Sequence, residues 1–417
     1  MRSIWVLLAG LLVTPLLVAG PAFAGEGEPV AKRGCAALAG RVNAVPGSGP
    51  AFLASYDGVE GEPALNGAAF TYDNALAAIA LVACGRVPEA HRIGDALLAA
   101  ATSDRADRDA RKKPEQPGGR LRNAYRAGPL NGIPQPHGWW DAAGGHWAED
   151  PMAVGTATGN VAWAGLALLT VAEATGDARF ADGARTLATW ATRHTWDRSG
   201  GGLDGGFTGG IHGDGAVTRM LGWKSTEHNV DLAALFGWLA RRDAYWTVPT
   251  RAARDFVAAA FDNGHFLTGT LPDGHSPNRA TSGLDAQLWP LLLEGAPVQW
   301  RTALDYARRA HGVDGGFDFN DDRDGIWWEG TAQAALALAA VGEMAAADAV
   351  LARLAGQFSP GGLIWATSVP RLTTGLALAP DSREADFFYY RRPHLGATAW
   401  AVLAARRWNP FTGKRLG

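Results

Sequence analysis

Residues 157–194 read ATGNVAWAGLALLTVAEATGDARFADGARTLATWATRH and contain two segments of helical period, separated by a short Gly-Asp turn. In the first segment, residues 157–175, apolar residues lie on nearly every face of a helix. In the second, residues 178–194, Arg and Asp residues give the helix a polar face. A helix that is apolar all round is buried, whereas one with a polar face lies outside. The stretch therefore predicts a hairpin of one inner and one outer helix.

The same pattern recurs along most of the chain. Further pairs lie at 69–85 with 87–102, 225–241 with 244–261, 282–295 with 298–311, and 330–342 with 344–358, and a less clear last unit includes 394–408. Helical hairpins that cannot bury their apolar faces alone must stack on one another. About six of them predict an all-α (α/α)6 toroid with a small irregular or short-β element. The glycine-rich stretch 198–215 is expected to be a loop or short hairpin over one end.

The first 24 residues are typical of a secretory signal peptide. Arg2 supplies a positive charge, residues 4–20 are almost wholly apolar, and residues 22–24 form an A-x-A cleavage pattern. A membrane anchor is the alternative, although Pro15 interrupts the apolar run. We expect export to the periplasm or the medium and a mature chain, 25–417, that forms a single toroid domain. No second apolar segment is long enough to span a membrane.

Composition narrows the class of partner. The net charge is −3, and the chain has none of the excess of basic residues that nucleic-acid-binding proteins carry. We also expect the protein to be a monomer. Tryptophan is abundant, with 17 residues, and indole rings stack on the C–H faces of sugars, although rings in the core are the alternative use. The only two cysteines, Cys35 and Cys84, either form one disulfide or remain separate buried thiols.

Five stretches stand where inner helices are expected to begin: TYDNALAAIAL, TGNVAWAGLALL, WKSTEHNVDLAALF, IWWEGTAQAALAL and HLGATAWAVLAARRWNPF. They resemble the inner-helix entries of six-hairpin glycosidases. The resemblance covers most of the mature chain and is to the superfamily, not to one numbered family. It implies a carbohydrate-active enzyme with an oligo- or polysaccharide substrate. Glycoside hydrolases predominate in the superfamily, but lyases, epimerases and phosphorylases also occur, so the fold alone does not choose the reaction.

Polar residues gather where the inner helices are expected to begin. If these helices run parallel around a ring, their N-termini converge on one mouth, where free N–H groups favour anions and hydroxyl oxygens. Capping is the plain alternative for single residues. Glu329 and Glu227 are the predicted catalytic pair, and Asp73 is a third candidate. The indole of Trp328 is expected to raise the pKa of the neighbouring Glu329 carboxyl, which suits a general acid. The sequence does not show which of the two glutamates is the acid and which the base.

Other residues near these starts are predicted to bind substrate. They are Trp140, Asp141, Asn160, Trp223, Lys224, His228, Asp231, Asp285, Gln287, Trp328, Gln333 and His394. One alternative is a sugar epimerase or uronate lyase that abstracts a proton with His228 or His394. The other is a non-catalytic toroid that binds glycans and whose acids only cap helices.

A run of acids precedes Glu329, and it raises the question of a metal. Asp318, Asn320, Asp322 and Asp324 alternate along the chain. An EF-hand loop needs glycine at its sixth position and an acidic ligand at its twelfth. If the loop starts at Asp318, the sixth position is Arg323, and if it starts at Asn320, the twelfth position is Thr331. Neither alignment therefore matches an EF-hand. Calcium is therefore a possible ligand and a solvated acidic turn is the alternative; no other cofactor is expected.

Overall fold

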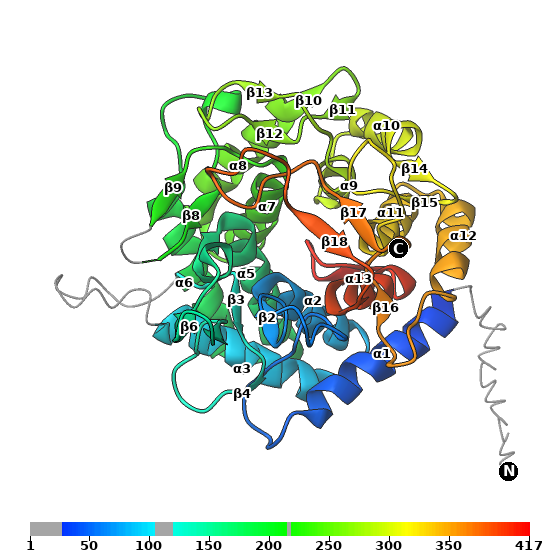
Figure 1. Cartoon of the computed structure of the whole chain (residues 1–417). Coiled ribbons are helices and arrows are strands. Elements are labelled where there is room, and N and C mark those ends of the chain that lie inside the picture. The colour runs from blue at the N-terminus through cyan, green and yellow to red at the C-terminus, as the bar shows by residue number, and fades with distance from the viewer. Residues whose placement is uncertain (1–26, 105–119, 215–217) are drawn as a thin grey trace, which may run out of the picture.

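The computed structural model describes residues 27–104, 120–214 and 218–417, so the predicted signal peptide lies outside the described residues. Its helices form two concentric rings (Figure 1). The inner ring consists of α2 (Thr71–Ala83), α5 (Thr158–Thr175), α7 (Thr226–Ala240), α9 (Leu284–Leu288) continued by η5 (Trp289–Leu292), α11 (Trp328–Ala340) and α13 (Leu395–Ala405). The outer ring consists of α1 (Gly27–Ala44), α3 (Val87–Ser103), α6 (Ala178–His194), α8 (Thr247–Ala260), η6 (Val298–Arg301) with α10 (Thr302–Ala310), and α12 (Met344–Leu354). The predicted all-α architecture is confirmed.

The α5–α6 hairpin shows why the two rings separate. Every residue of α5 from Val161 to Val171 is buried, whereas α6 buries one face only. Gly176 ends α5 with φ +74°, a conformation that glycine adopts without steric cost. Asp177 then caps α6, because its side chain accepts a hydrogen bond from the backbone N–H of Arg179.

The inner helix predicted over 282–295 is shorter than expected. The α-helix ends at Leu288, and η5 follows from Trp289 to Leu292. Pro290 accounts for the break, since proline has no backbone N–H and its ring clashes with the preceding turn of an α-helix.

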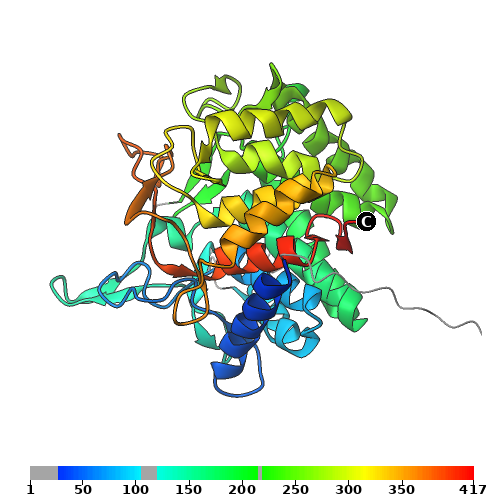
Figure 2. The same ribbon diagram turned by 90° about the vertical axis from the view of Figure 1, so that its right-hand side faces the viewer.

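Helix α1 closes the ring, and the sequence did not predict it. It packs against α13 and also contacts α12 and α2. The sequence pattern showed no outer helix to pair with α13, and α1 is that outer helix. Figure 2 shows α1 (dark blue) beside α13 (red), which brings together two segments from opposite ends of the chain. Cys35 in α1 and Cys84 at the end of α2 form a disulfide, which decides the question that the sequence left open.

All strands in the described ranges are two or three residues long. The antiparallel pairs are β1 (Ala51–Phe52) with β4 (Gly128–Pro129), β2 (Ala68–Phe70) with β3 (Ala124–Arg126), β5 (Trp139–Asp141) with β6 (His146–Ala148), β10 (Phe261–Asp262) with β11 (His265–Phe266), β12 (Gly269–Thr270) with β13 (Pro277–Asn278), β14 (Gly312–Val313) with β15 (Gly316–Phe317), β16 (Ile364–Trp365) with β19 (Pro393–His394), β17 (Arg371–Thr373) with β18 (Phe388–Tyr390), and β20 (Trp408–Asn409) with β21 (Lys414–Arg415). One three-stranded sheet joins β7 (Thr156–Ala157), β8 (Gly210–His212) and β9 (Arg219–Leu221). The described part of the glycine-rich stretch supplies β8 and the short helix η2 (Gly202–Asp204). Two further short helices are α4 (Pro151–Val154) and η4 (Ala244–Trp246).

Aromatic rings fill the centre of the inner ring. The ring centroid of Trp163 lies 5.4 Å from that of Trp289, 5.6 Å from that of Trp400 and 5.2 Å from that of Phe411. The three indoles come from three different inner helices, and Phe411 follows α13. These rings are buried, so they form a solid floor rather than an open channel.

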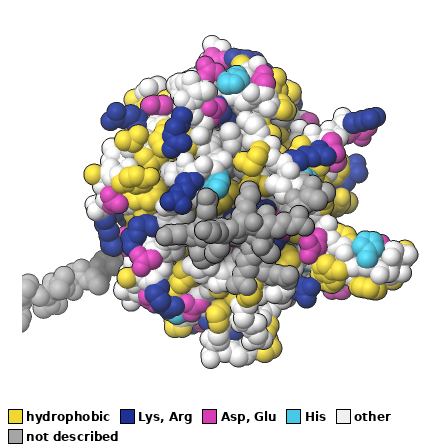
Figure 3. All heavy atoms as spheres, turned by 90° about the vertical axis from the view of Figure 1, so that its left-hand side faces the viewer, with side chains coloured by type: hydrophobic (Ala, Val, Ile, Leu, Met, Phe, Trp, Pro, Cys, Tyr) yellow, Lys and Arg dark blue, Asp and Glu magenta, His cyan; other side chains and the backbone are white. Residues whose placement is uncertain are grey.

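On the face shown in Figure 3, basic and acidic side chains are interspersed. Within the described ranges, no helix is both long and apolar enough to cross a membrane.

Candidate active site

Polar groups from different inner helices meet at the N-terminal end of the ring, as expected. Glu329 of α11 contacts Tyr72 of α2, and His394 at the start of α13 contacts Asp73 of α2. A Cβ placed on Gly159 of α5 would lie 2.6 Å from the His228 ring of α7, so only glycine allows these helices to approach so closely here. The starts of these inner helices therefore lie together at one end of the ring.

Glu329 is the centre of a buried network. Its side chain is 1% exposed, and Oε1 accepts a hydrogen bond of 2.8 Å from the Tyr72 hydroxyl. The Tyr72 oxygen in turn accepts one of 2.8 Å from Trp400 Nε1. Oε2 lies 3.4 Å from Nδ1 of His394. Tyr72 therefore connects the carboxyl of Glu329 to the aromatic floor.

His394 bridges two acids. Its Nε2 lies 3.3 Å from Asp73 Oδ2, and its Nδ1 faces Glu329. Tyr56 stacks on the imidazole, with centroids 4.4 Å apart. Burial alone would lower the pKa of His394, but the charge and hydrogen bond of Asp73 and the charge of Glu329 outweigh it and raise the pKa. These charges favour the protonated imidazole more than in a free histidine, although Nδ1 also accepts the backbone N–H of Ala397 at 3.3 Å.

A second acid cluster lies on α7 and α9. Glu227 and Asp231 are one helical turn apart, and a Cβ on Gly283 would lie 3.2 Å from Glu227 Oε1, which places the start of α9 against Glu227. The pKa of Asp285 is raised well above its ordinary value, by burial first and then by the nearby carboxylates of Glu227 and Glu329. Asp285 thus lies close to both predicted catalytic glutamates.

Both glutamates have raised pKa values, for partly different reasons. Burial raises the pKa of Glu227 to about 7, although a small part of this side chain reaches the surface of the mouth. Burial also raises the pKa of Glu329 to about 7, while the charge of His394 and the Tyr72 hydrogen bond act in the opposite direction. Glu329 therefore has partners that stabilise its ionised form, and Glu227 lacks such partners among the described residues.

Unpaired polar atoms concentrate at this mouth. Within the described part of the chain, these buried atoms have no hydrogen-bond partner of normal geometry: His228 Nδ1, Asp231 Oδ1, Asp285 Oδ1, Glu329 Oε2, and Nε2 and Oε1 of Gln333. Gln333 still lowers the pKa of Asp285, and Trp163 that of Asp231, so these groups face one another without closing good hydrogen bonds. Leaving a buried polar group unpaired costs about 1–3 kcal/mol, so such groups are rare and call for an explanation. The cluster can accept and donate several hydrogen bonds to a hydroxyl-rich ligand.

Comparisons with known proteins agree with this fold. No family model and no curated protein matches the chain by sequence. Among solved structures, a glycosidase in complex with glucose matches with a TM-score of 0.58 and 15% identity over 91% of this chain and 97% of that one. The cellobiose 2-epimerase from Spirochaeta thermophila gives 0.59 and 13% over 91% and 96%, and an α-mannanase from Bacteroides thetaiotaomicron gives 0.54 and 10% over 91% and 95%. The chain is a six-hairpin (α/α)6 toroid. The resemblance stated from the five sequence stretches is confirmed at the level of fold.

The toroid does not direct every predicted residue into its mouth, and two binding predictions need correction. Lys224 is fully buried, and its Nζ bonds Asp197 at 2.7 Å and the backbone oxygens of Leu203 and Asp204 at 3.0 Å. Gln287 is also buried, and its amide accepts from and donates to the backbone of Phe266. Both side chains hold loops in place, so their polar groups are not available to substrate.

Other predicted binding residues lie around the site or apart from it. Asn160 is partly exposed and donates to Asn123 Oδ1 at 2.7 Å. Trp223 is partly exposed, with its ring 5.5 Å from that of His228, so it forms a wall beside the α7 acids. Trp328 is buried in the hydrophobic core, so its ring is not a stacking wall for substrate.

Trp140 and Asp141 lie on the β5–β6 hairpin, apart from the acids. The hairpin projects from the body of the toroid (Figure 2). Trp140 is 63% exposed and pairs across the hairpin with Trp147, which is 41% exposed. The two rings therefore offer apolar surface to a partner, and an oxygen of Asp141 lies 4.0 Å from His146 Nδ1.

The sequence did not identify the tyrosines at the mouth as site residues. The pKa of Tyr389 on β18 is raised by burial first and then by the nearby Glu329 carboxylate, which places its hydroxyl close to the acids. Its ring also packs on Trp327, 5.3 Å between centroids. Tyr72 adjoins Asp73 in the sequence and could have been included, but Tyr56 and Tyr389 lie outside the inner-helix starts on which the prediction rested.

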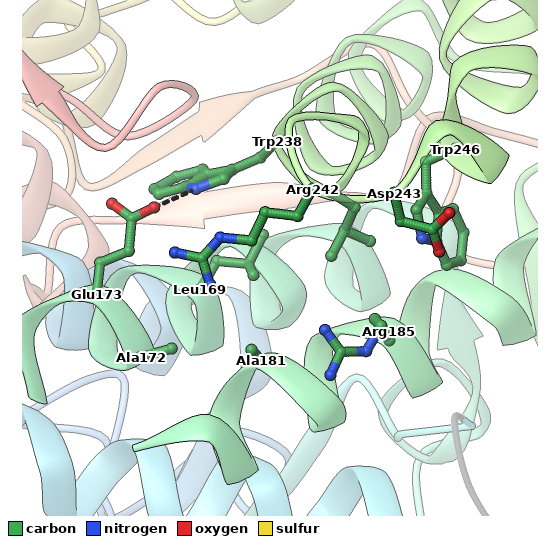
Figure 4. A pocket seen from close by; sticks show the side chains of 10 residues that line it. Leu169, Ala172, Glu173, Ala181, Arg185, Trp238, Arg242, Asp243 and Trp246 are labelled. Carbon is green, nitrogen blue, oxygen red and sulfur yellow. Dashed lines mark hydrogen bonds between the residues drawn. The ribbon is translucent and has the colours of Figure 1, made fainter. Parts of the chain in front are cut away.

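A separate pocket lies at the other end of the toroid. It is lined by the C-terminal ends of α5 and α7 together with part of α6, including Leu169, Glu173, Arg185 and Trp238 (Figure 4). Trp238 Nε1 donates to Glu173 Oε1 at 2.7 Å. None of the predicted site residues lines this pocket, so we assign the candidate active site to the N-terminal mouth.

Two clusters in the described part of the chain have the composition of metal sites. In one, ligand atoms of Asp73, Glu329 and His394 lie within 4.8 Å of one another. In the other, the same holds for Asp318, Asp322 and Asp324. The first cluster contains His394, whose raised pKa favours a positive charge beside the two acids, whereas among the described residues no Lys or Arg pairs with the second.

The raised pKa of Glu227 predicts a pH-dependent stability effect. The unfolded chain ionises this group near 4.5, whereas the folded chain does so at about 7, so its contribution to stability is present below pH 4.5 and is lost as pH rises through 7. We expect Glu227→Gln to stabilise the protein at pH 8 by about 1–3 kcal/mol and to be nearly neutral at pH 4. Thermal unfolding at both pH values measures this, with the exposed Glu60→Gln as control. An equal effect at both pH values would contradict it.

Proposed function

We propose that this chain is an exported enzyme that hydrolyses glycosidic bonds, with Glu227 as general acid and Glu329 as general base or nucleophile. The observation that carries the proposal is the pair of desolvated glutamates at the mouth, both with pKa near 7 and both close to Asp285. A glycosidase needs one protonated and one ionised carboxyl across the scissile bond. Each of these carboxyls can be protonated or ionised near pH 7. The neighbouring side chains therefore decide which glutamate is the acid and which is the base or nucleophile.

Those partners support the division of roles. His394, when protonated, and the Tyr72 hydroxyl stabilise a negative charge on Glu329. Among the described residues no cation pairs with Glu227, and its neighbours Asp231 and Asp285 are also acids. Glu227 is therefore the better proton donor to the leaving oxygen, while Glu329 activates water or attacks the anomeric carbon.

The mouth and its surroundings also suit a sugar. The unpaired atoms of Asp231, Asp285 and Gln333 offer partners for hydroxyl groups. The exposed rings of Trp140 and Trp147 would stack on sugar units further along a glycan chain. The structural likeness to a glycosidase in complex with glucose and to an α-mannanase supports this substrate class.

Export is the second part of the proposal. It rests on the signal-peptide pattern of residues 1–24 and agrees with the Cys35–Cys84 disulfide, since disulfides persist in oxidising compartments.

A sugar epimerase is the second candidate, and one observation favours it. Burial lowers the pKa of His228 to about 4, so its imidazole is neutral near pH 7 and has an unpaired Nδ1. A neutral imidazole there can accept a proton, and His394 supplies a second histidine. The fold is also similar to that of a cellobiose 2-epimerase.

A panel of oligo- and polysaccharides distinguishes the candidates. We expect new reducing ends to appear with at least one glycan, because hydrolysis shortens the chain. Unchanged chain length with an inverted C–H centre would favour the epimerase, and an ultraviolet-absorbing double bond would indicate a lyase. Binding without turnover across the panel would leave the non-catalytic glycan-binding toroid.

A further inference from the structure

The loop that leads into α11 carries an acidic cluster that the proposed reaction does not use. Carboxylate oxygens of Asp318, Asp322 and Asp324 lie within 4.8 Å of one another. Asp318 is fully buried, and its two oxygens accept hydrogen bonds from the backbone N–H groups of Phe319 and Asp324. Closely spaced carboxylates repel one another when they are ionised, and a cation between them would remove that repulsion.

An independent observation points to a ligand at this cluster. Asn320 is 4% exposed, and its Nδ2 donates to Asp322 Oδ2 at 3.0 Å, so its carboxamide lies against the cluster and a half-turn of the amide would present Oδ1 to the acids. Its Oδ1 is buried and has no hydrogen-bond partner among the described residues. An orphaned carbonyl oxygen beside three carboxylates is the environment that a hard cation satisfies.

We propose that Asp318, Asn320, Asp322 and Asp324 bind one calcium ion that fastens the β17–β18 hairpin to the start of α11. All four side chains offer oxygen, whereas zinc prefers His and Cys. Asp322 and Asp324 are exposed, which leaves room for the waters that complete a shell of six to eight oxygens.

The cluster is already joined to β17. Thr373 donates its backbone N–H to Asp324 at 3.0 Å, and its hydroxyl bonds Asp322. β17 pairs with β18, which carries Tyr389 to the mouth. A cation here would neutralise the repelling acids and hold this connection, five residues before Glu329 in the chain.

Calcium binding to the full chain tests the proposal without any substrate. After removal of divalent ions, isothermal titration should show one calcium per chain, and calcium should raise the melting temperature while magnesium does so far less. Asp322→Asn and Asn320→Ala should each weaken calcium binding at least tenfold, and the exposed Asp255→Asn should not.

Hydrogen exchange supplies a local readout. Chelation should increase exchange in residues 371–376 and 386–390 and leave the remote β5–β6 hairpin unchanged. No binding and no thermal shift at millimolar calcium would overturn the proposal, as would binding that persists in both variants. These results do not depend on turnover, so the calcium site and the proposed hydrolysis can fail separately.

Discussion

Glu227→Gln should lower kcat on a natural glycan by about 10²–10⁴-fold, because the amide cannot donate the proton that the leaving oxygen requires. A substrate with an activated leaving group needs little protonation, so its hydrolysis should fall much less. Steady-state rates on the two substrates measure the contrast, and the exposed Glu60→Gln serves as control.

Glu329→Gln should differ in a diagnostic way. The variant cannot activate water or attack the sugar, so both substrates should lose about 10²–10⁴-fold in rate. Sparing of the activated substrate by Glu329→Gln rather than Glu227→Gln would reverse the two roles. A stable Glu329→Gln protein with near-normal turnover would remove Glu329 from the mechanism and leave Glu227 with Asp73.

The arrangement of helices could be predicted because the pattern is local. In residues 157–194 the all-apolar and amphipathic segments follow one another, so the inner and outer positions are readable from the chain. Helix α1 was missed because its partner α13 lies at the opposite end of the sequence, and no neighbouring repeat marks the pair. Pro290 was visible, but its effect on the length of α9 was not anticipated.

The candidate site was predictable only in part. Glu227, Glu329 and Asp73 sit in the first turns of inner helices, and parallel helices bring such turns together. Lys224 lies just before the N-cap of α7, yet its side chain turns to Asp197, which the helical pattern cannot reveal. Tyr389 reaches the mouth from a short strand outside the helical hairpins, so only tertiary structure shows it.

Replacing both cysteines, Cys35→Ser with Cys84→Ser, should lower the free energy of unfolding by about 4 kcal/mol on the chain-entropy account of a loop of this length. The disulfide spans 49 residues of sequence and joins α1 to the end of α2. Thermal and denaturant unfolding under oxidising conditions measure the loss. A reductant should destabilise the wild type to a similar degree and leave the double variant unchanged.

The position of this disulfide predicts where the loss should appear first. Helix α1 is the outer partner of α13, and their contact joins segments from the two ends of the chain. Without the crosslink, α1 is held by packing alone, so hydrogen exchange should rise in α1 and in α13 before it rises in the α5–α6 hairpin. The start of α13 carries His394, which contacts Asp73 and Glu329. Loosening of this closure should therefore lower activity as well as stability, whereas uniform destabilisation with no excess exchange in α1 would show that the ring closes without the disulfide.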